Sequence, residues 1–376
     1  MEEKYIRYQK ERDVLFVFGA GASISDGGPL QKDLLPEILS EDYSDSGLAN
    51  LVKEFISTNF DTDHGNSPSL ESVFGYLDYF ISKKESLKGG HTTNQLISIK
   101  ESLIRLIHHR ISEPKTRKGV YKKFLKCLDK INKNVSIITM NYDTLLDESF
   151  DFLYPNQALI DYCINFMNYE DYDKIDAFNW WVNPREPVSI WGGKTPTPIK
   201  IIKIHGSLNW KYCNCCNQVL LTPWDTAIDL KSQGFKGRIG ASSENPKEII
   251  FDLKCPNDQT PFDTFIVPPS HIKDLNHPAI SKLFDEAAIE IRKTKKIIFV
   301  GYSFPEADVH IKALFKKNLS NDTEIEVVDP FLNERIKSNY RSISKKSLFI
   351  KDSFENYIEN ELENKIKPPP NKGVHS

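Results

Sequence analysis

The sequence predicts an α/β protein built on a parallel sheet, and three observations indicate it. Short apolar runs alternate with amphipathic helical stretches along the chain. The runs are continuously apolar, as strands covered on both faces must be. Five of them end in Gly, Asn, Asp, His or Ser. Because ligands bind beyond the carboxyl ends of parallel strands, these polar ends predict one shared crevice.

Five strands are expected in this sheet, at residues 14–18, 135–139, 199–204, 297–300 and 325–328. Helices are expected around them, at residues 122–131, 144–150, 279–292, 309–317 and 355–366. The last of these helices runs into three consecutive prolines, which cannot continue it.

These elements predict a core assembled from distant segments. The expected core takes residues 12–29, 120–155, 199–211 and 280–352. A helical insertion (30–119), an irregular aromatic-rich capping segment (156–198) and a smaller cysteine-bearing module (212–279) interrupt it, and a helix with a loose tail (353–376) follows.

The composition excludes several classes of protein. Of 376 residues, 39% are hydrophobic, which is enough for a core and excludes general disorder. The 49 basic and 52 acidic residues leave a net charge of −3, so direct nucleic-acid binding is not expected. The mean hydropathy is −0.43 and the first residues are charged. We therefore expect a cytoplasmic protein without a membrane segment.

The first strand runs into a glycine-rich turn, Gly19-Ala20-Gly21-Ala22-Ser23. Glycines let a backbone approach a phosphate closely, and a helix that begins there favours an anion. The pattern is neither a P-loop nor a complete Rossmann fingerprint. A tight strand-to-helix turn without a ligand is the alternative interpretation.

Polar residues follow three later strands. Asn141 could position a water or a ribose hydroxyl, while Asp143 could act in the site or cap the next helix. His205, followed by glycine, is a candidate general base. Gly301 and Ser303 could contact ribose or phosphate, or form a simple turn.

A cysteine cluster indicates a structural zinc site. Cys213 and Cys216 make one Cys-x-x-Cys pair, and Cys255 stands three residues before Asp258. The fourth ligand would be Asp258 or Cys215. The alternative is a degenerate module that folds without metal.

In this order, five segments together resemble the sirtuin fold family, and more closely its bacterial branch of NAD-hydrolysing antiphage defence proteins. They are GAGAS (19–23), ITMNYD (138–143), KIHGSLNW (203–210), IVPP (266–269) and VGYSFPEAD (300–308). The resemblance implies a sirtuin-type Rossmann-like sheet with a helical insertion and a smaller zinc-ribbon-like module.

The resemblance also implies roles for individual residues. Asn141 and His205 would be catalytic, with the asparagine orienting the ribose and a water. The residues expected to bind NAD+ are Gly19, Ala20, Gly21, Ser23, Asp143, Gly301, Ser303 and, by a looser match, Asp329.

Two departures favour water over a peptide as the acceptor. The glycine-rich turn lacks the Phe-Arg pair of protein-deacylating sirtuins, and Pro268 and Pro269 remove backbone donors where a peptide strand would pair. The expected function is therefore NAD+ hydrolysis to nicotinamide and ADP-ribose. An NAD-dependent protein deacylase and a non-catalytic nucleotide sensor are the alternatives.

Such a hydrolase needs a gate, because uncontrolled NAD+ loss is toxic. The resemblance implies a homo-oligomer and a separately encoded partner, such as a HerA-type ATPase or a short Argonaute. Aromatic residues between positions 154 and 191, expected to be exposed, are a further reason to expect an oligomer.

Overall fold

The computed structural model describes residues 2–368, apart from 44–45, 63–66, 88–89, 114–116, 154–157, 168–180, 191–194, 223–226, 233, 240–246, 252 and 274. Trp180 and Trp191 of the aromatic-rich segment, and the tail expected to be loose from residue 369 onward, lie outside the described residues. No helix in the described ranges is long and apolar enough to cross a membrane.

A seven-stranded parallel sheet forms the core, in the order β15-β14-β13-β2-β3-β6-β4. Its strands are β2 (Arg12–Phe18), β3 (Val135–Thr139), β4 (Ala158–Asp161), β6 (Thr197–Lys203), β13 (Thr294–Val300), β14 (Glu324–Val328) and β15 (Ser347–Ile350). The fold class predicted from sequence is confirmed. The two edge strands, β4 and β15, were not predicted because each has only four residues and lies at a rim.

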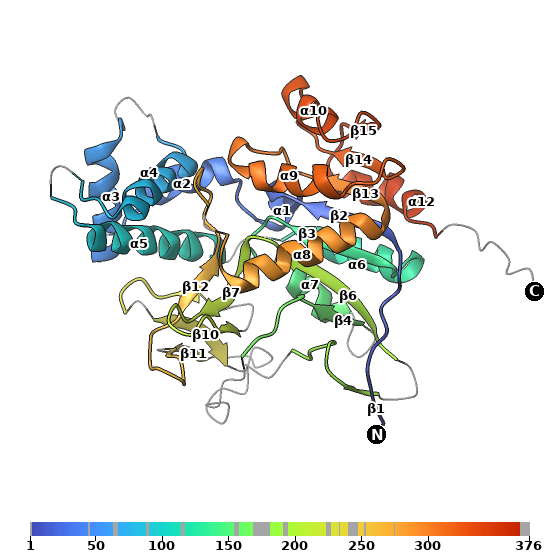
Figure 1. Ribbon diagram of the computed structural model, residues 1–376, viewed down its shortest axis with the longest axis horizontal. Helices are drawn as coiled ribbons and strands as arrows, with labels where there is room; N and C mark the ends of the chain where they lie inside the picture. Colours follow the sequence, from blue (N-terminus) through green and yellow to red (C-terminus); the bar gives the residue numbers. More distant parts are fainter. Residues whose placement is uncertain are drawn as a thin grey trace, which may run out of the picture.

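Helices cover both faces of the sheet (Figure 1). On one face, α6 (Val120–Ile131) and α11 (Phe354–Tyr357) pack on β2 through Phe18, Phe124 and Phe354, whose rings lie 5.3 to 5.6 Å apart. The remaining core helices are α7 (Leu145–Leu153), α8 (Pro278–Lys293), α9 (Val309–Asn318), α10 (Glu334–Arg341) and α12 (Glu363–Lys365). Helix α8 packs against β2, β6 and β13.

Four helices make a separate layer beside the sheet, at the left of Figure 1. They are α2 (Gln31–Ser40), α3 (Gly47–Asn59), α4 (Leu70–Lys83) and α5 (Thr93–Ser112), which share their own apolar core. Helix α5 begins with a capping box formed by Thr92 and Gln95. Ile266 joins this core, which ties the helical layer to the small module described next.

Antiparallel strands form the small module below the helical layer in Figure 1. One sheet holds β12 (Asp263–Ile266), β7 (Gly206–Tyr212) and β8 (Val219–Leu221), and the other holds β11 (Lys247–Phe251), β10 (Phe235–Ile239) and β9 (Ala227–Ile228). At the N-terminus, β1 (Glu2–Lys4) pairs with β5 (Val188–Ile190). Since β7 follows β6 after two residues, the site residue His205 lies at the joint between the two sheets.

The expectation of exposed aromatic residues between positions 154 and 191 is wrong for those that the structure describes. Tyr162 is fully buried. Phe166 and Trp181 are half-buried and pack edge to face with their ring centroids 5.1 Å apart. The Trp181 indole donates a hydrogen bond to the Ile160 carbonyl at 3.0 Å. These rings cover the edge of the sheet because β4 would otherwise expose its apolar side.

Candidate functional site

The carboxyl ends of the central strands meet, and their turns are joined by backbone hydrogen bonds. The amide of Gly19 donates to Val300 at 3.0 Å, and the amide of Met140 donates to Phe18 at 2.9 Å. The amide of Ile204 donates to Thr139 at 3.2 Å. The turns after β2, β3, β6 and β13 therefore form one connected surface.

Glycine is required where the first and last of these turns touch. A Cβ on Gly19 would lie 2.5 Å from the Gly301 oxygen, and a Cβ on Gly21 would lie 2.7 Å from the Gly301 Cα. Gly301 itself has a φ of +59°. Steric contact between the turns is thus sufficient to explain these glycines, whose amides donate to the carbonyls of Val300, Gly301 and Val328.

Ser23 is the centre of a hydrogen-bond network behind the glycine-rich turn. Its hydroxyl donates to Asp143 Oδ2 at 2.9 Å and lies 2.9 Å from the Tyr121 hydroxyl. The Asn141 amide donates to Ser23 Oγ at 2.9 Å and to the Gly19 carbonyl at 3.0 Å. A serine hydroxyl has one hydrogen and two lone pairs, so these three partners use its whole capacity.

Asp143 links this network to the start of α7. Its Oδ1 accepts from the Leu145 amide at 3.2 Å, so the carboxylate does cap the helix. Burial raises the pKa of Asp143, while the charge of Lys203 and the Ser23 hydroxyl oppose that rise. The Lys203 ammonium lies 2.6 Å from the Asp143 carbonyl and 3.0 Å from Asp147 Oδ2. Lys203 and Asp147 are residues of the site that sequence reasoning missed.

His205 is buried directly after the carboxyl end of β6. Burial, followed by the charge of Lys273, lowers the pKa of His205 to about 3, so the ring is neutral near pH 7. The next residue must be glycine, because Gly206 has a φ of +81° and a Cβ there would lie 2.1 Å from the Phe265 oxygen. The His-Gly pair therefore fixes both the position and the charge of the imidazole.

A second histidine faces His205, and sequence reasoning missed it. The Nε2 atoms of His205 and His310 lie 3.0 Å apart. Asp308 stands beside them and binds Lys273 through Oδ1 at 2.5 Å and the Tyr302 hydroxyl through Oδ2 at 2.7 Å. Asp308 and His310 follow directly on the turn that begins at Gly301, but the sequence does not indicate their contact with His205.

The other predicted nucleotide contacts lie on the same edge of the sheet. Ser303 is exposed. Asp329, at the end of β14, accepts from the Phe331 amide at 2.7 Å, and burial raises its pKa. Ala20 opens the short helix α1 (Ala20–Ser23). The structure thus brings the residues predicted after five different strands to one side of the molecule.

Comparison with known families agrees with this geometry. A family model described as the SIR2-like domain matches residues 135–330, which is more than half of the chain. The chain belongs to the SIR2-like domain family. The match covers β3, β6 and β13 with the turns that carry Asn141, His205 and Gly301.

Several solved Sir2 structures are similar to the chain at low sequence identity. A Sir2 homolog–NAD complex is 12% identical, with 95% of this chain and 90% of that chain covered and a TM-score of 0.44. A Sir2 homologue mutant–ADP ribose complex is 13% identical, with 95% and 92% covered and a TM-score of 0.43. A Sir2–p53 peptide–NAD+ complex is 13% identical, with 94% of each chain covered and a TM-score of 0.40. No curated protein is significantly similar to the chain.

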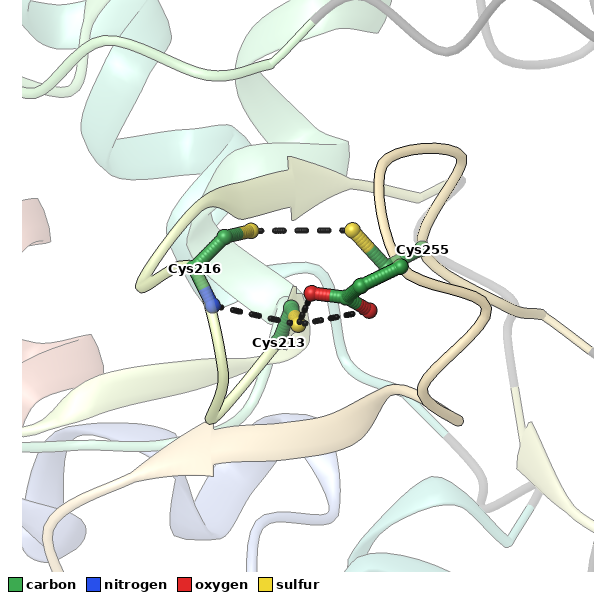
Figure 2. Close-up of side chains that lie close together, drawn as sticks. Cys213, Cys216 and Cys255 are labelled. Carbon is green, nitrogen blue, oxygen red and sulfur yellow. Dashed lines mark hydrogen bonds between the residues drawn. The ribbon is translucent and has the colours of Figure 1, made fainter.

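This SIR2-like chain gathers its cysteine cluster as the sequence predicts, with ligand atoms from Cys213, Cys216, Cys255 and Asp258 within 4.8 Å of one another. Figure 2 shows the three sulfur atoms converging from two loops. The Cys216 and Cys255 sulfurs lie 3.6 Å apart, and Cys213 Sγ lies 3.3 Å from Asp258 Oδ2. Cys215, the alternative ligand, is exposed and is not a member of this group.

The donor set fits a tetrahedral zinc ion. Four ligands at ordinary zinc–sulfur distances stand roughly 3.8 Å from one another, close to the spacing observed. The Thr260 amide and side chain lower the pKa of Asp258 to about 2, so its carboxylate is charged at neutral pH. These four residues would hold the ion at the tip of the small module.

An open cleft of about 720 Å³ lies at the other end of the strands. Its lining includes Arg7, Arg12, Lys133 and Asn134, which stand near the beginnings of β2 and β3. It therefore faces away from Asn141 and His205.

Proposed function

We propose that this SIR2-like protein is an NAD+ hydrolase that cleaves the nicotinamide–ribose bond. One observation carries the proposal: the Asn141 amide donates to Gly19 in the glycine-rich turn, and the segment before the neutral His205 is hydrogen-bonded to the end of β3, just before Asn141. In this proposal the glycine-rich turn would hold the pyrophosphate, the Asn141 side chain would orient the ribose and His205 would accept a proton. The family resemblance supplies the identity of the dinucleotide.

In the proposed reaction the bond between ribose C1′ and the pyridinium nitrogen breaks, and its electron pair neutralises the ring. Nicotinamide leaves, and the ribose carries oxocarbenium character in the transition state. A water oxygen then bonds to C1′ and gives its proton to His205. The products are nicotinamide, ADP-ribose and one proton. Asn141 holds the segment that positions the ribose.

The backbone beside His205 favours water as the acceptor. The amide of Val267 donates to the His205 carbonyl at 2.8 Å, and its carbonyl accepts from the Tyr142 hydroxyl at 2.7 Å. Pro268 and Pro269 follow and have no amide hydrogen. A peptide strand would therefore have no free backbone partner at Val267, which disfavours the deacylase alternative.

We further propose that zinc, where bound, is structural. Cys213, Cys216, Cys255 and Asp258 would hold it in the small module, whose strand β7 follows β6 and His205. The ion would tie two loops together. Antiphage defence, a homo-oligomeric state and control by a HerA-type ATPase or a short Argonaute belong to this proposal on the resemblance alone.

The test is chromatography of the products from purified protein given NAD+ alone, NAD+ with an acyl-lysine peptide, or NAD+ with candidate partners. Nicotinamide and ADP-ribose without a peptide support the hydrolase. Consumption that requires the peptide would assign a deacylase, and binding without products would assign a sensor.

The decisive variant is Asn141→Ala. We expect at least a hundredfold loss of NAD+ cleavage, because both the ribose contact and the tie to Gly19 disappear. Asn183→Ala is the matched control, since its side chain lies in a surface turn, where it donates to Glu186 at 3.0 Å and accepts from the Arg185 amide at 3.1 Å. Undiminished cleavage by folded Asn141→Ala would remove the assignment.

A further inference from the structure

The contact between His205 and His310 defines the tautomers of both rings. Two Nε2 atoms 3.0 Å apart form a hydrogen bond only if one of them carries a hydrogen. His205 also bonds the backbone of Met140, whose amide is already donated to Phe18. The partner is therefore the Met140 carbonyl, and the ring must donate to it. His205 thus carries its hydrogen on Nδ1, and His310 donates from Nε2.

Burial and the charge of Lys273 keep both rings neutral, against the opposing charge of Asp308. Lys273 and Asp308 face the two histidines, and the hydroxyl of Tyr302 reaches them through Asp308. The rings of Tyr142 and Phe284 complete the surroundings. Burial and the Lys273 charge lower the pKa of His310 to about 4. Both Asp308 oxygens are already bonded, to Lys273 and to Tyr302. A cation between the histidines would have to displace that ammonium group, so a hydrogen-bonded pair fits this cluster better.

A general base accepts a proton through a free lone pair, here on His205 Nε2. In this structure that lone pair accepts the hydrogen bond from His310. We propose that His310 is a positioning residue that caps this base: its Nε2–H holds the Nε2 lone pair of His205 until a ribose hydroxyl or the nucleophilic water replaces it. The inference rests on the proposed role of His205. It adds a resting state in which the base is withheld from solvent.

The hydrogen bond from His310 to His205 must break at each turnover. It therefore lowers the fraction of protein in which His205 is free to accept a proton. Removing the cap with His310→Ala should therefore lower KM and raise kcat/KM about fivefold near neutral pH, the factor that one net hydrogen bond is worth. His310→Gln keeps an N–H donor that can reach His205 and serves as the matched control. It should behave like the unmodified protein.

The pH dependence of kcat/KM gives a second test, in which His310→Ala lowers kcat/KM in acid instead of raising it. In the unmodified protein His205 stays neutral well below pH 6, so kcat/KM should be level there. In His310→Ala, water reaches Nε2 and the pKa of His205 rises toward its ordinary value. Its kcat/KM should then decline as the pH falls through 6, whereas His310→Gln should keep the level profile.

Nitrogen-15 NMR of the histidine rings tests the pairing without any turnover. We expect an Nδ1–H tautomer for His205 and an Nε2–H tautomer for His310, and loss of their mutual hydrogen bond when ADP-ribose is added. Opposite tautomers, or a His205 spectrum unchanged in His310→Ala, would overturn the cap. If the two tautomers are as expected but the protein cleaves no dinucleotide, the hydrolase assignment is wrong and the histidine pairing still holds.

Discussion

Single residues in this crevice often have two explanations, and the contacts distinguish them. Ser23 was expected to contact a phosphate, yet its hydroxyl bonds Asp143, Asn141 and Tyr121. Asp26 interrupts the dinucleotide fingerprint because it caps α6, accepting from the amides of Gly119, Val120 and Tyr121 at 2.6 to 3.0 Å. Both side chains therefore stabilise the turn.

Replacing Ser23 by alanine tests this interpretation. Asp143 and Tyr121 would lose a buried partner, so we expect the free energy of unfolding to fall by about 1–3 kcal/mol. NAD+ cleavage should fall with it, because Asn141 loses one of its two anchors. Chemical denaturation and a product assay measure the two effects. Ser25→Ala, two residues along the chain, is the control and should change neither.

At the scale of elements, continuous apolar runs predicted the inner strands of the central sheet. The five predicted strands are the sheet's five inner strands, because a strand buried on both faces must be apolar throughout. The edge strands β4 and β15 were missed since short, half-covered segments carry no such pattern. Helix α10 was missed for the same reason, because only Ile336 and Tyr340 of it are buried.

The site residues that directly follow a strand could be predicted from the sequence, whereas those placed by the packing of other segments could not. Residues directly after a strand lie at its carboxyl end whatever the tertiary details, so Asn141 and His205 could be identified from sequence. His310 and Lys273 could not, because their positions depend on how α9 and the segment before α8 pack. No sequence pattern reports a contact between loops that far apart.

The junction of two turns makes a sharp prediction for Gly301→Ala. Gly301 has a φ of +59°, and an added Cβ would lie 2.4 Å from the Ala22 amide nitrogen. We expect a loss of roughly 2–4 kcal/mol in unfolding free energy, from backbone strain together with overpacking. Gly47→Ala is the control, since nothing lies within 4 Å and helix α3 begins there. Equal thermal midpoints for the two variants would contradict the close approach.

The small module should depend on metal. Cys216→Ser removes one of four proposed ligands, so we expect it to lower both bound zinc and the unfolding temperature. A chelator should do the same to the unmodified protein and nothing further to the variant. Cys127→Ser is the control, because Cys127 lies on α6 and outside the cluster. Metal analysis by mass spectrometry with calorimetry gives both readouts; a full zinc complement in Cys216→Ser would exclude this ligand set.

Across the whole molecule, the near balance of charges conceals a buried layer of ion pairs between α8 and the sheet. Glu286 accepts from Lys200 at 2.7 Å and from Arg185 at 3.0 Å. Glu290 accepts from Arg12 and lies 2.9 Å from Lys200. Breaking one member of such a group leaves a buried charge unpaired. The layer lies near the amino ends of the strands, opposite the candidate crevice.

This layer predicts how stability depends on pH. Burial alone would raise the pKa of Glu286, but Arg185 and Lys200 lower it to about 2 from an ordinary value of 4.5. A depressed pKa stabilises the fold above 4.5, and the contribution is lost as the pH falls toward 2. Glu286→Gln should therefore unfold at lower temperature near pH 7, with the difference shrinking below pH 4.5. Glu306→Gln, which is exposed, should show no such trend, and parallel curves for Glu286→Gln would contradict the pairing.

The contact of Gly19 and Gly21 with Gly301 has a consequence for how such a crevice can change. Main chain meets main chain there, and not even a methyl group fits between. Variation is thereby expected outside this contact, where Ser303 is exposed and Asp329 directly follows β14. New ligand preferences in proteins built this way should therefore arise at positions such as these two, while the contact between the glycine turns stays unchanged.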